Sequence, residues 1–395
     1  MLVRLLSIGD IGVLDGMMHI GDEAMFEALR DEMAMRDVGL VAVSSAPTES
    51  ADRYGVPSVR NVGFRGLSRA AATERMRLVI DAAKRPSALE TDDPAREVID
   101  AVAGTDGVVV AGGGNLASRW SAHVFERATL AGIAGALGRP VVVTGQTLGP
   151  DLDPEDRAVL SPAFRAARLV GVRESASYAL ARELGVEARL GVDDASFLGD
   201  RDSDVDESGA RRGVLVSLSL SLGDLPRPQA VARLARLIDE AAALTGEAVA
   251  FHAHFGPLDP GAPPRGDAIL HDEVRERMSA RSEVIPTGDP RAAARLARSS
   301  ALLITGRYHP AVFAAPAGVP IVGLTSDDYT RIKQLGALAH WGQDGVAALG
   351  AVDTDGTATL RRVWHDRAAI SAAAEARMPA NRAEASAWWD SVARG

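Results

Sequence analysis

Short apolar runs rich in β-branched residues alternate with helix-like segments along almost the whole chain. Residues 3–8, 107–111 and 301–305 are runs of this kind, and each leads toward a segment with helical periodicity. Such alternation is typical of parallel sheets that are covered by helices on both faces. We therefore expect an α/β fold.

The expected elements fall into two groups of similar size. The first group has strands at 3–8, 40–44, 107–111, 140–144 and 169–172, and helices at 22–35, 122–137 and 175–184. The second has strands at 213–218, 248–253, 284–285, 301–305 and 320–324, and helices at 229–244, 267–279, 290–298 and from 310 onward. We predict irregular, mobile loops at 47–67 and 86–95.

The stretch 200–212 separates the two groups. It is rich in charged and small polar residues, as a surface linker is. We predict an N-terminal Rossmann-like domain over 1–200, a C-terminal one over 213–375, and a cleft between them. A C-terminal helix over 376–395 should pack its two tryptophans, Trp388 and Trp389, onto another element.

Length and composition exclude several classes of protein. A chain of 395 residues is long for one core and suggests two domains. The formal charge of −10 argues against nucleic acid as the main partner, because phosphate backbones are bound by basic surfaces. Cysteine is absent, so no disulfide or thiolate chemistry is expected. No stretch approaches the roughly 18 apolar residues of a membrane span, and we expect a cytoplasmic protein.

Arg307 and His309 follow the apolar run 301–305, where a strand gives way to a helix that Pro310 can open. Ligands of open α/β sheets bind at this edge, and backbone N–H groups at a helix start attract anions. A guanidinium binds a carboxylate or phosphate with two hydrogen bonds, and a histidine can transfer a proton near neutral pH. Alternatively, Arg307 caps a loop and His309 fills a polar gap.

Four glycine-containing turns also follow strands. Gly21 precedes Asp22, whose carboxylate could either stabilise the first turn of a helix through the helix dipole or belong to a substrate site. Three glycines at 112–114, followed by Asn115, allow a ligand close to the backbone or simply a tight turn. Gln146 and Thr147 offer neutral donors and acceptors suited to sugar hydroxyls or an anion. Arg173 either binds substrate or pairs with Glu174.

The remaining histidines and acidic residues give no metal signature. His252 and His254 are two positions apart at a strand end, so they should point to opposite faces and not bind one metal together. His271 is expected on a helix surface. There is neither an H-E-x-x-H motif nor a His/Cys cluster, so no metal is implied.

Seven motifs follow one another between His19 and Lys333. They are H-I-G-D-E-A, A-G-G-G-N, G-Q-T-L-G-P, V-R-E-S-A-S, D-D-A-S-F, R-Y-H-P-A-V-F-A-A-P-A-G-V-P-I-V and D-Y-T-R-I-K. In this order they resemble the polysaccharide pyruvyl transferase family, in which the last motif looks like the family's Tyr-x-x-Lys stretch. The resemblance implies two Rossmann-like domains in a GT-B-like arrangement. The N-terminal domain would bind the acceptor and the C-terminal domain phosphoenolpyruvate.

The implied reaction moves the pyruvyl group of phosphoenolpyruvate onto two hydroxyls of one sugar as a ketal. Arg307 and His309 match the family's Arg-x-His element at the phosphoenolpyruvate site, Arg173 matches an upstream arginine, and Gly21 with Asp22 matches its Gly-Asp pair. His19 stands where the family usually has asparagine, which suggests an unusual acceptor.

Chemical considerations assign provisional roles to these residues. Ketal formation needs a general acid and a general base, and we expect His309 to be the acid, with Asp22 or Asp194 orienting or deprotonating the acceptor. Further substrate contacts are expected from Gly113, Gly114, Asn115, Gln146, Thr147 and Lys333.

The partners expected from these roles are phosphoenolpyruvate as co-substrate and a sugar, nucleotide-sugar or lipid-linked sugar as acceptor. We expect no cofactor, and the sequence leaves open whether the protein forms a homo-oligomer. One alternative is a GT-B nucleotide-sugar glycosyltransferase or epimerase, with Asp327 or Asp328 reading a ribose. Another is a degenerate relative that binds a glycan or metabolite without catalysis.

Overall fold

The computed structural model describes residues 3–200 and 211–394. Within them, the chain forms two compact units, each built on a parallel sheet. Unit 1 comprises Met1–Leu14, Met25–Asp194 and Glu384–Gly395, and unit 2 comprises Asp15–Ala24 and Ala195–Ala383. Two helices, α1 (Ile20–Ala34) and α14 (Arg367–Ala393), supply residues to both units.

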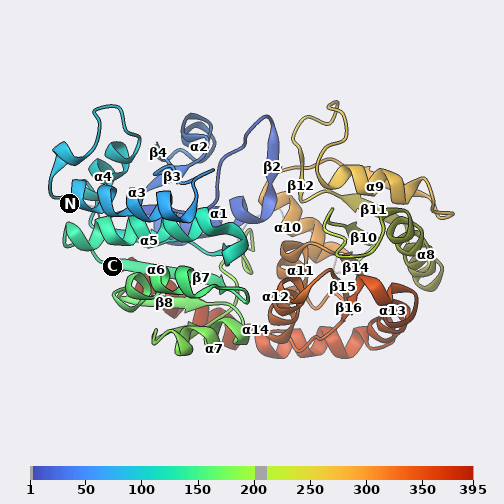
Figure 1. Ribbon diagram of the computed structural model, residues 1–395. Helices are drawn as coiled ribbons and strands as arrows, with labels where there is room; N and C mark the ends of the chain where they lie inside the picture. The colour runs from blue at the N-terminus through green and yellow to red at the C-terminus, as the bar shows by residue number, and fades with distance from the viewer. Residues whose placement is uncertain (1–2, 201–210, 395) are drawn as a thin grey trace. The chain divides into compact units, whose positions relative to one another are not determined.

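The sheet of unit 1 has the strand order β4-β3-β1-β5-β7-β8-β9, with β6 also paired to β7, and its pairs are parallel. Strands β3, β4, β7 and β8 of this sheet are labelled in Figure 1. Its strands are β1 (Arg4–Ile8), β3 (Gly39–Ser44), β4 (Ser58–Arg60), β5 (Gly107–Val110), β6 (Gly113–Leu116), β7 (Val141–Leu148), β8 (Leu169–Val172) and β9 (Arg189–Leu190). Besides parts of α1 and α14, its helices are α2 (Pro47–Tyr54), α3 (Arg69–Ala82), α4 (Ala95–Ala103), α5 (Ser121–Ala136), α6 (Pro154–Arg165) and α7 (Ser175–Glu183).

Side chains alternate between the two faces of this sheet, and both faces are buried under helices. Leu6 and Val108 belong to a core that includes residues of α3 to α6, whereas Leu5 and Val109 belong to a second core with residues of α1 and α14. Trp389 is buried in that second core, as expected for the C-terminal tryptophans.

The sheet of unit 2 is parallel, with the order β13-β11-β10-β14-β15-β16 (Figure 1). Helices α8, α9 and α13 cover one face, and α10, α11 and α12 pack together beside the other. Its strands are β10 (Val214–Ser217), β11 (Val249–His252), β13 (Ser282–Ile285), β14 (Leu302–Thr305), β15 (Ile321–Thr325) and β16 (Val346–Ala348). Its helices are α8 (Arg227–Thr245), α9 (Asp267–Arg275), α10 (Pro290–Ser299), α11 (Tyr308–Ala314), α12 (Asp328–Ala339) and α13 (Thr357–His365), with most of α14.

Unit 2 also contains a small antiparallel sheet that the sequence pattern did not predict. In it, β2 (Met17–His19) pairs with β12 (Phe255–Pro257). Unit 2 therefore includes a segment from near the start of the chain. The predicted domain ranges of 1–200, 213–375 and 376–395 differ here from the compact units, and α14 begins before residue 376.

The predicted irregular segments contain regular structure. The segments 47–67 and 86–95 are not irregular throughout, because they contain α2, β4 and a short 3₁₀ turn at Pro86–Ala88. Most of the predicted linker at 200–212 lies outside the described residues.

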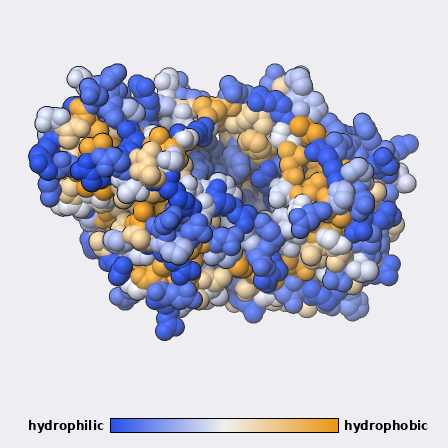
Figure 2. All heavy atoms as spheres, in the orientation of Figure 1, coloured by the Kyte–Doolittle hydropathy of each residue, from blue (hydrophilic) through white to orange (hydrophobic). Residues whose placement is uncertain are grey.

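Polar residues dominate the face in Figure 2, and no helix among the described residues has the length and apolarity to cross a membrane.

Candidate active site

The start of α1 is fixed within unit 2 by backbone hydrogen bonds. His19 lies opposite Phe255 in the β2–β12 pair, with the two ring centroids 5.4 Å apart. The N–H of Ile20 donates to the carbonyl oxygen of His254 at 3.0 Å. These contacts place the first turn of α1, with Gly21 and Asp22, beside the chain that follows β11.

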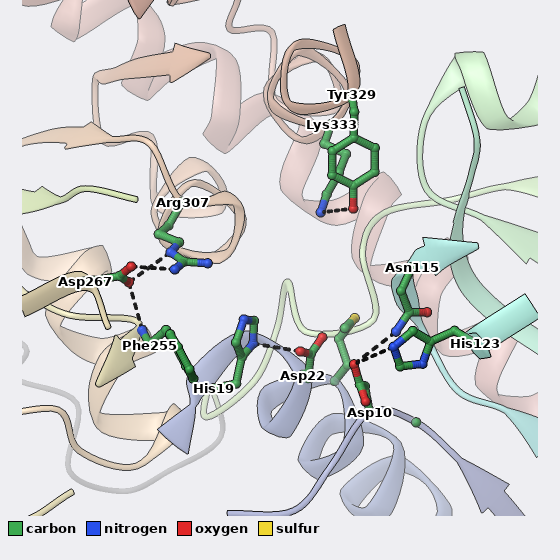
Figure 3. Close-up of polar contacts among 12 residues, drawn as sticks. Asp10, His19, Asp22, Asn115, His123, Phe255, Asp267, Arg307, Tyr329 and Lys333 are labelled. Carbon is green, nitrogen blue, oxygen red and sulfur yellow. Dashed lines mark hydrogen bonds and ion pairs between the residues drawn. The ribbon is translucent and has the colours of Figure 1, made fainter. Parts of the chain in front are cut away.

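Asp22 and His19 form an ion pair in this turn, with 2.7 Å between His19 Nδ1 and Asp22 Oδ2 (Figure 3). Burial by itself would raise the pKa of Asp22. The attraction and hydrogen bond of His19, and the charges of His309 and Lys333, outweigh burial and hold that pKa well below its ordinary value. Asp22 is therefore a carboxylate surrounded by basic side chains.

Gly21 and His309, which are far apart in the sequence, are in direct contact. His309 is buried on α11, with 8% of its surface exposed. A Cβ atom added to Gly21 would lie 1.9 Å from Nδ1 of His309. Glycine at position 21 is thus required by the close approach of the histidine ring.

Arg307 forms an ion pair with Asp267 of α9 (Figure 3). Its Nε donates to Oδ2 of Asp267 at 2.9 Å, and Nη2 donates to Oδ1. The Asp267 side chain is fully buried, whereas that of Arg307 is 22% exposed. Asp267 therefore orients the guanidinium and uses one edge of it, while Nη1 takes no part in the pair.

Lys333 of α12 lies between two tyrosine rings. Its Nζ donates to the hydroxyl of Tyr329 at 3.0 Å (Figure 3). The same nitrogen lies 4.6 Å from the ring centroid of Tyr329 and 4.8 Å from that of Tyr308. Cation–π contacts of this kind stabilise the ammonium. The stretch 328–333, in which three residues rather than two separate the tyrosine from the lysine, thus brings its lysine toward α11.

The expectations for the other histidines of unit 2 were wrong. His252 and His254 do not point to opposite faces, because β11 ends at His252 and the strand alternation stops there. Their ring centroids are 5.1 Å apart, and both side chains are buried. His271 is buried rather than exposed, and its Nε2 accepts a hydrogen bond from the N–H of Leu218 at 2.9 Å.

Burial keeps these three imidazoles neutral at pH 7. It lowers the pKa of His252 to about 4 and that of His271 to about 3. The pKa of His254 lies well below its ordinary value because of burial and of nearby His252, His309, Arg307 and His19. His19 and His309 therefore affect the pKa of both His254 and Asp22, and we call His19, His309, Lys333 and Arg307 the basic cluster of unit 2.

Arg173 in unit 1 is fully buried and pairs with an acidic residue. Its Nη1 donates to Oδ2 of Asp193 at 2.6 Å, and its Nε donates to the hydroxyl of Thr147 at 2.9 Å. Glu174, the partner considered from the sequence, lies at 3.8 Å and accepts from Thr147. A contact of Arg173 with substrate remains a prediction.

Asp194 lies against two of the predicted glycine turns in unit 1. The hydroxyl of Thr144 donates to its Oδ2 at 2.6 Å, and the N–H of Gly112 also bonds to it. Burial, together with the charge of Asp193, raises the pKa of Asp194 to about 7. A carboxyl group that titrates near neutrality can act as general acid or base.

We expect Asp194 to make stability depend on pH. Between pH about 4 and 7 the folded protein holds a proton that the unfolded chain has released, so stability falls as pH rises through this window and then levels off. Asp194→Asn cannot ionise, so its melting temperature should rise relative to that of the wild type from pH about 4 to 7, and the difference should stay constant above pH 7. Thermal melts across this range test the assignment, and a pH-independent difference would contradict it.

Asn115 belongs to a second polar group in unit 1 that the sequence did not reveal. Its Nδ2 donates to Oδ2 of Asp10 at 3.2 Å, and Nε2 of His123 lies 3.7 Å from the same oxygen (Figure 3). Arg127 contacts Nδ1 of His123 at 2.7 Å and donates to the carbonyl of Gly9. Asp10 lies two residues after the end of β1, and this place beside a strand end was the only feature of the sequence that pointed to it.

Among the described residues, no group of three or more His, Cys, Asp or Glu side chains is arranged to hold a metal ion. Asp267 was also missed from the sequence, because nothing near it resembles a motif. Of the two acidic residues considered for a ribose, Asp327 caps α12, and its Oδ1 accepts a hydrogen bond from the N–H of Thr330 at 2.8 Å. Asp328 forms an exposed ion pair with Arg331.

Several solved structures with the same fold are described as glycosyltransferases or sugar epimerases. One is a putative UDP-N-acetylglucosamine 2-epimerase from Listeria monocytogenes (TM-score 0.59, 12% identity, covering 95% of this chain and 92% of that one). Others are the glycotransferase of kitacinnamycin (0.57, 14%, 99% and 98%) and the glycosyltransferase SnogD from Streptomyces nogalater (0.51, 17%, 100% and 100%). At these identities the likeness shows the fold alone, and it confirms the predicted fold class.

The family follows from the sequence itself. The model of the polysaccharide pyruvyl transferase family matches residues 19–328, so the chain belongs to this family of transferases. The match begins at His19 and includes Arg307 and His309, in agreement with the predicted resemblance. No curated protein sequence matches the chain significantly.

Proposed function

We propose that this protein transfers the pyruvyl group of phosphoenolpyruvate to two hydroxyls of a sugar or glycoconjugate, forming a ketal and releasing phosphate. One observation carries the proposal beyond family membership. Unit 2 gathers basic side chains from separate stretches of the chain around the start of α1. The charges of His19, His309 and Lys333 lower the pKa of Asp22. Those of His19, His309 and Arg307 lower the pKa of His254. Phosphoenolpyruvate, with a carboxylate and a phosphate, suits such a cluster.

The reaction needs one proton delivered to carbon and two removed from hydroxyls. A proton added to C3 of phosphoenolpyruvate makes C2 electrophilic, and the first hydroxyl attacks C2 and loses its proton. Phosphate then leaves as the second hydroxyl attacks and loses its own. One proton ends in the new methyl group and the other on phosphate.

We assign delivery of the C3 proton to His309, because its ring is buried and within electrostatic reach of the Asp22 carboxylate. Asp22 would stabilise the protonated imidazole. Arg307, oriented by Asp267, would bind an anionic group of phosphoenolpyruvate through Nη1, which takes no part in the pair with Asp267. Asp194 in unit 1 is the candidate base for the acceptor.

A direct assay tests the function. Purified protein is incubated with phosphoenolpyruvate and a panel of sugars, nucleotide sugars and lipid-linked sugars, while released phosphate and the new ketal methyl signal are followed by NMR. We expect both products in equal amounts with at least one acceptor. Absence of phosphoenolpyruvate binding, together with turnover of a nucleotide sugar alone, would instead favour a glycosyltransferase or epimerase.

Arg307→Lys should weaken phosphoenolpyruvate binding by about 10- to 100-fold. Lysine keeps the charge but cannot pair with Asp267 through two nitrogens and bind an anion through a third. The measurement is phosphoenolpyruvate affinity by titration calorimetry.

Arg75→Lys is the matched control, because Arg75 forms a comparable double hydrogen bond with Asp93 and is similarly exposed. Arg75→Lys should lower the stability of the fold without weakening phosphoenolpyruvate binding. Equal phosphoenolpyruvate affinity in the two variants would remove Arg307 from the proposed site.

A further inference from the structure

Two amide side chains in unit 1 present acceptor oxygens over the same glycine. Gly113 in β6 is paired with Gln146 in β7, and Asn115 follows two positions later in β6. A Cβ atom built on Gly113 would have as its nearest neighbours Oδ1 of Asn115 and Oε1 of Gln146, each at 3.4 Å. Both oxygens therefore border the space that a side chain at position 113 would fill.

Hydrogen bonds fix the orientation of each amide. Nε2 of Gln146 donates to the carbonyl of Ala111, and Nδ2 of Asn115 donates to the carboxylate of Asp10. A reversed amide would place an oxygen against an oxygen in either case, so the two carbonyl groups must face Gly113.

Neither oxygen has a hydrogen-bond partner within residues 3–200 and 211–394, although both atoms are buried. Gln146 is only 1% exposed. A buried acceptor without a donor costs free energy, so the arrangement calls for a donor from outside the described chain. Two oxygens that converge on one point favour a single group that donates there.

The chemistry of the surroundings defines the donor. Acceptor oxygens, together with the nearby carboxylate of Asp10, disfavour phosphate and carboxylate ligands. The two amide oxygens are neutral, and the one carboxylate is bonded to Asn115 and lies near His123, so a buried cation would lack a full counter-charge. A hydroxyl group is neutral and small enough for this space, and its one proton can be shared between the two oxygens in a bifurcated hydrogen bond.

We infer that Asn115 and Gln146 bind a hydroxyl of the acceptor sugar over Gly113, an inference that rests on the proposed function. Gly113 is then specifically required because a side chain would occupy the place of the hydroxyl. The site would select sugars by a hydroxyl at one ring position, separately from the basic cluster of unit 2 that we assign to phosphoenolpyruvate.

Gly113→Ala is the sharpest variant for a test. The added methyl group would make ordinary contacts at 3.4 Å, and the backbone of Gly113 is not in the left-handed region, so the variant should fold. Gln146→Met removes the acceptor at similar volume. The controls are Gly135→Ala, whose added methyl would meet no atom within 4 Å, and Gln343→Met. Gln343 is also buried, donates to a backbone carbonyl and has an unpartnered oxygen among the described residues, but it lies in unit 2.

The probes are methyl β-glucoside, methyl β-galactoside, methyl β-mannoside and N-acetylglucosamine, with binding measured by NMR titration in the absence of phosphoenolpyruvate. For the best-bound sugar, both test variants should weaken binding about 10- to 100-fold, the range for a buried hydroxyl that loses its hydrogen bond, and both controls should leave it unchanged. Phosphoenolpyruvate affinity should be unchanged in all four variants.

Analogues of the best-bound sugar identify the kind of group that is read. At one ring position the deoxy and deoxyfluoro analogues should lose affinity equally, because fluorine does not donate a hydrogen bond. That loss should disappear in Gly113→Ala. No binding of any of the four sugars, or binding that is equal in wild type and both test variants, would overturn the inference. Failure of the proposed function would appear independently, as absent phosphoenolpyruvate binding.

Discussion

Replacing His309 by alanine should reduce turnover by about 10²- to 10⁴-fold, the usual contribution of a positioned general acid. The imidazole is buried on α11, touches Gly21 and lies within electrostatic reach of Asp22. His309→Gln keeps a hydrogen-bonding group of similar size but cannot supply a proton, so it should be nearly as inactive. Steady-state phosphate release from phosphoenolpyruvate, with the acceptor found active, measures both effects.

A structural histidine would give a different pattern, and His271 provides the comparison. His271 is buried and bonds to the N–H of Leu218, and it has no role in the proposed reaction. His271→Gln should lower the melting temperature and leave kcat nearly unchanged. If His309→Gln behaved in the same way, with turnover that kept its pH dependence, His309 would be at most an anion ligand.

Gly21→Ala should reduce kcat by about 10²-fold although it adds only a methyl group. That methyl would lie 1.9 Å from Nδ1 of His309, so the imidazole must move, and a displacement of about 1 Å at a reacting group has this order of effect. Alanine otherwise favours a helix over glycine by about 1 kcal/mol, so the loss cannot come from the helix itself. Gly350→Ala, whose methyl group would meet nothing within 4 Å in unit 2, is the control.

Combining the two substitutions separates displacement of the ring from other causes. In a His309→Ala background the ring is gone, and Gly21→Ala should cost no further activity and should raise the melting temperature. Additive losses of activity in the double variant would show that Gly21 acts through something other than His309.

The sequence was sufficient for the fold class, because hydrophobic periodicity is a local property. The strands β1, β8 and β14 and the helices α5 and α10 lie within a residue or two of their predicted ranges. The short strands β2 and β12 were missed. Each has only three residues, and their pairing depends on a contact between distant parts of the chain that no local pattern encodes.

For the candidate site, motifs identified individual residues but not their partners. The Arg-x-His and Gly-Asp elements were recognisable, and the structure brings Gly21, Asp22 and His309 together. The partners of the arginines were not visible, because ion pairs such as Arg307–Asp267 join separate elements. The alternation rule also failed for His254, since it lies beyond the last residue of β11.

The discontinuous composition of unit 2 has a consequence for how the protein is made. Strand β2 leaves the ribosome early, whereas its partner β12 is synthesised after every strand of the unit 1 sheet. The turn that holds Gly21 and Asp22 must therefore wait for residues 255–257 before it reaches its final place. A fragment that starts at Ala195 would lack this turn, so one cut in the chain cannot release unit 2 with its candidate site complete.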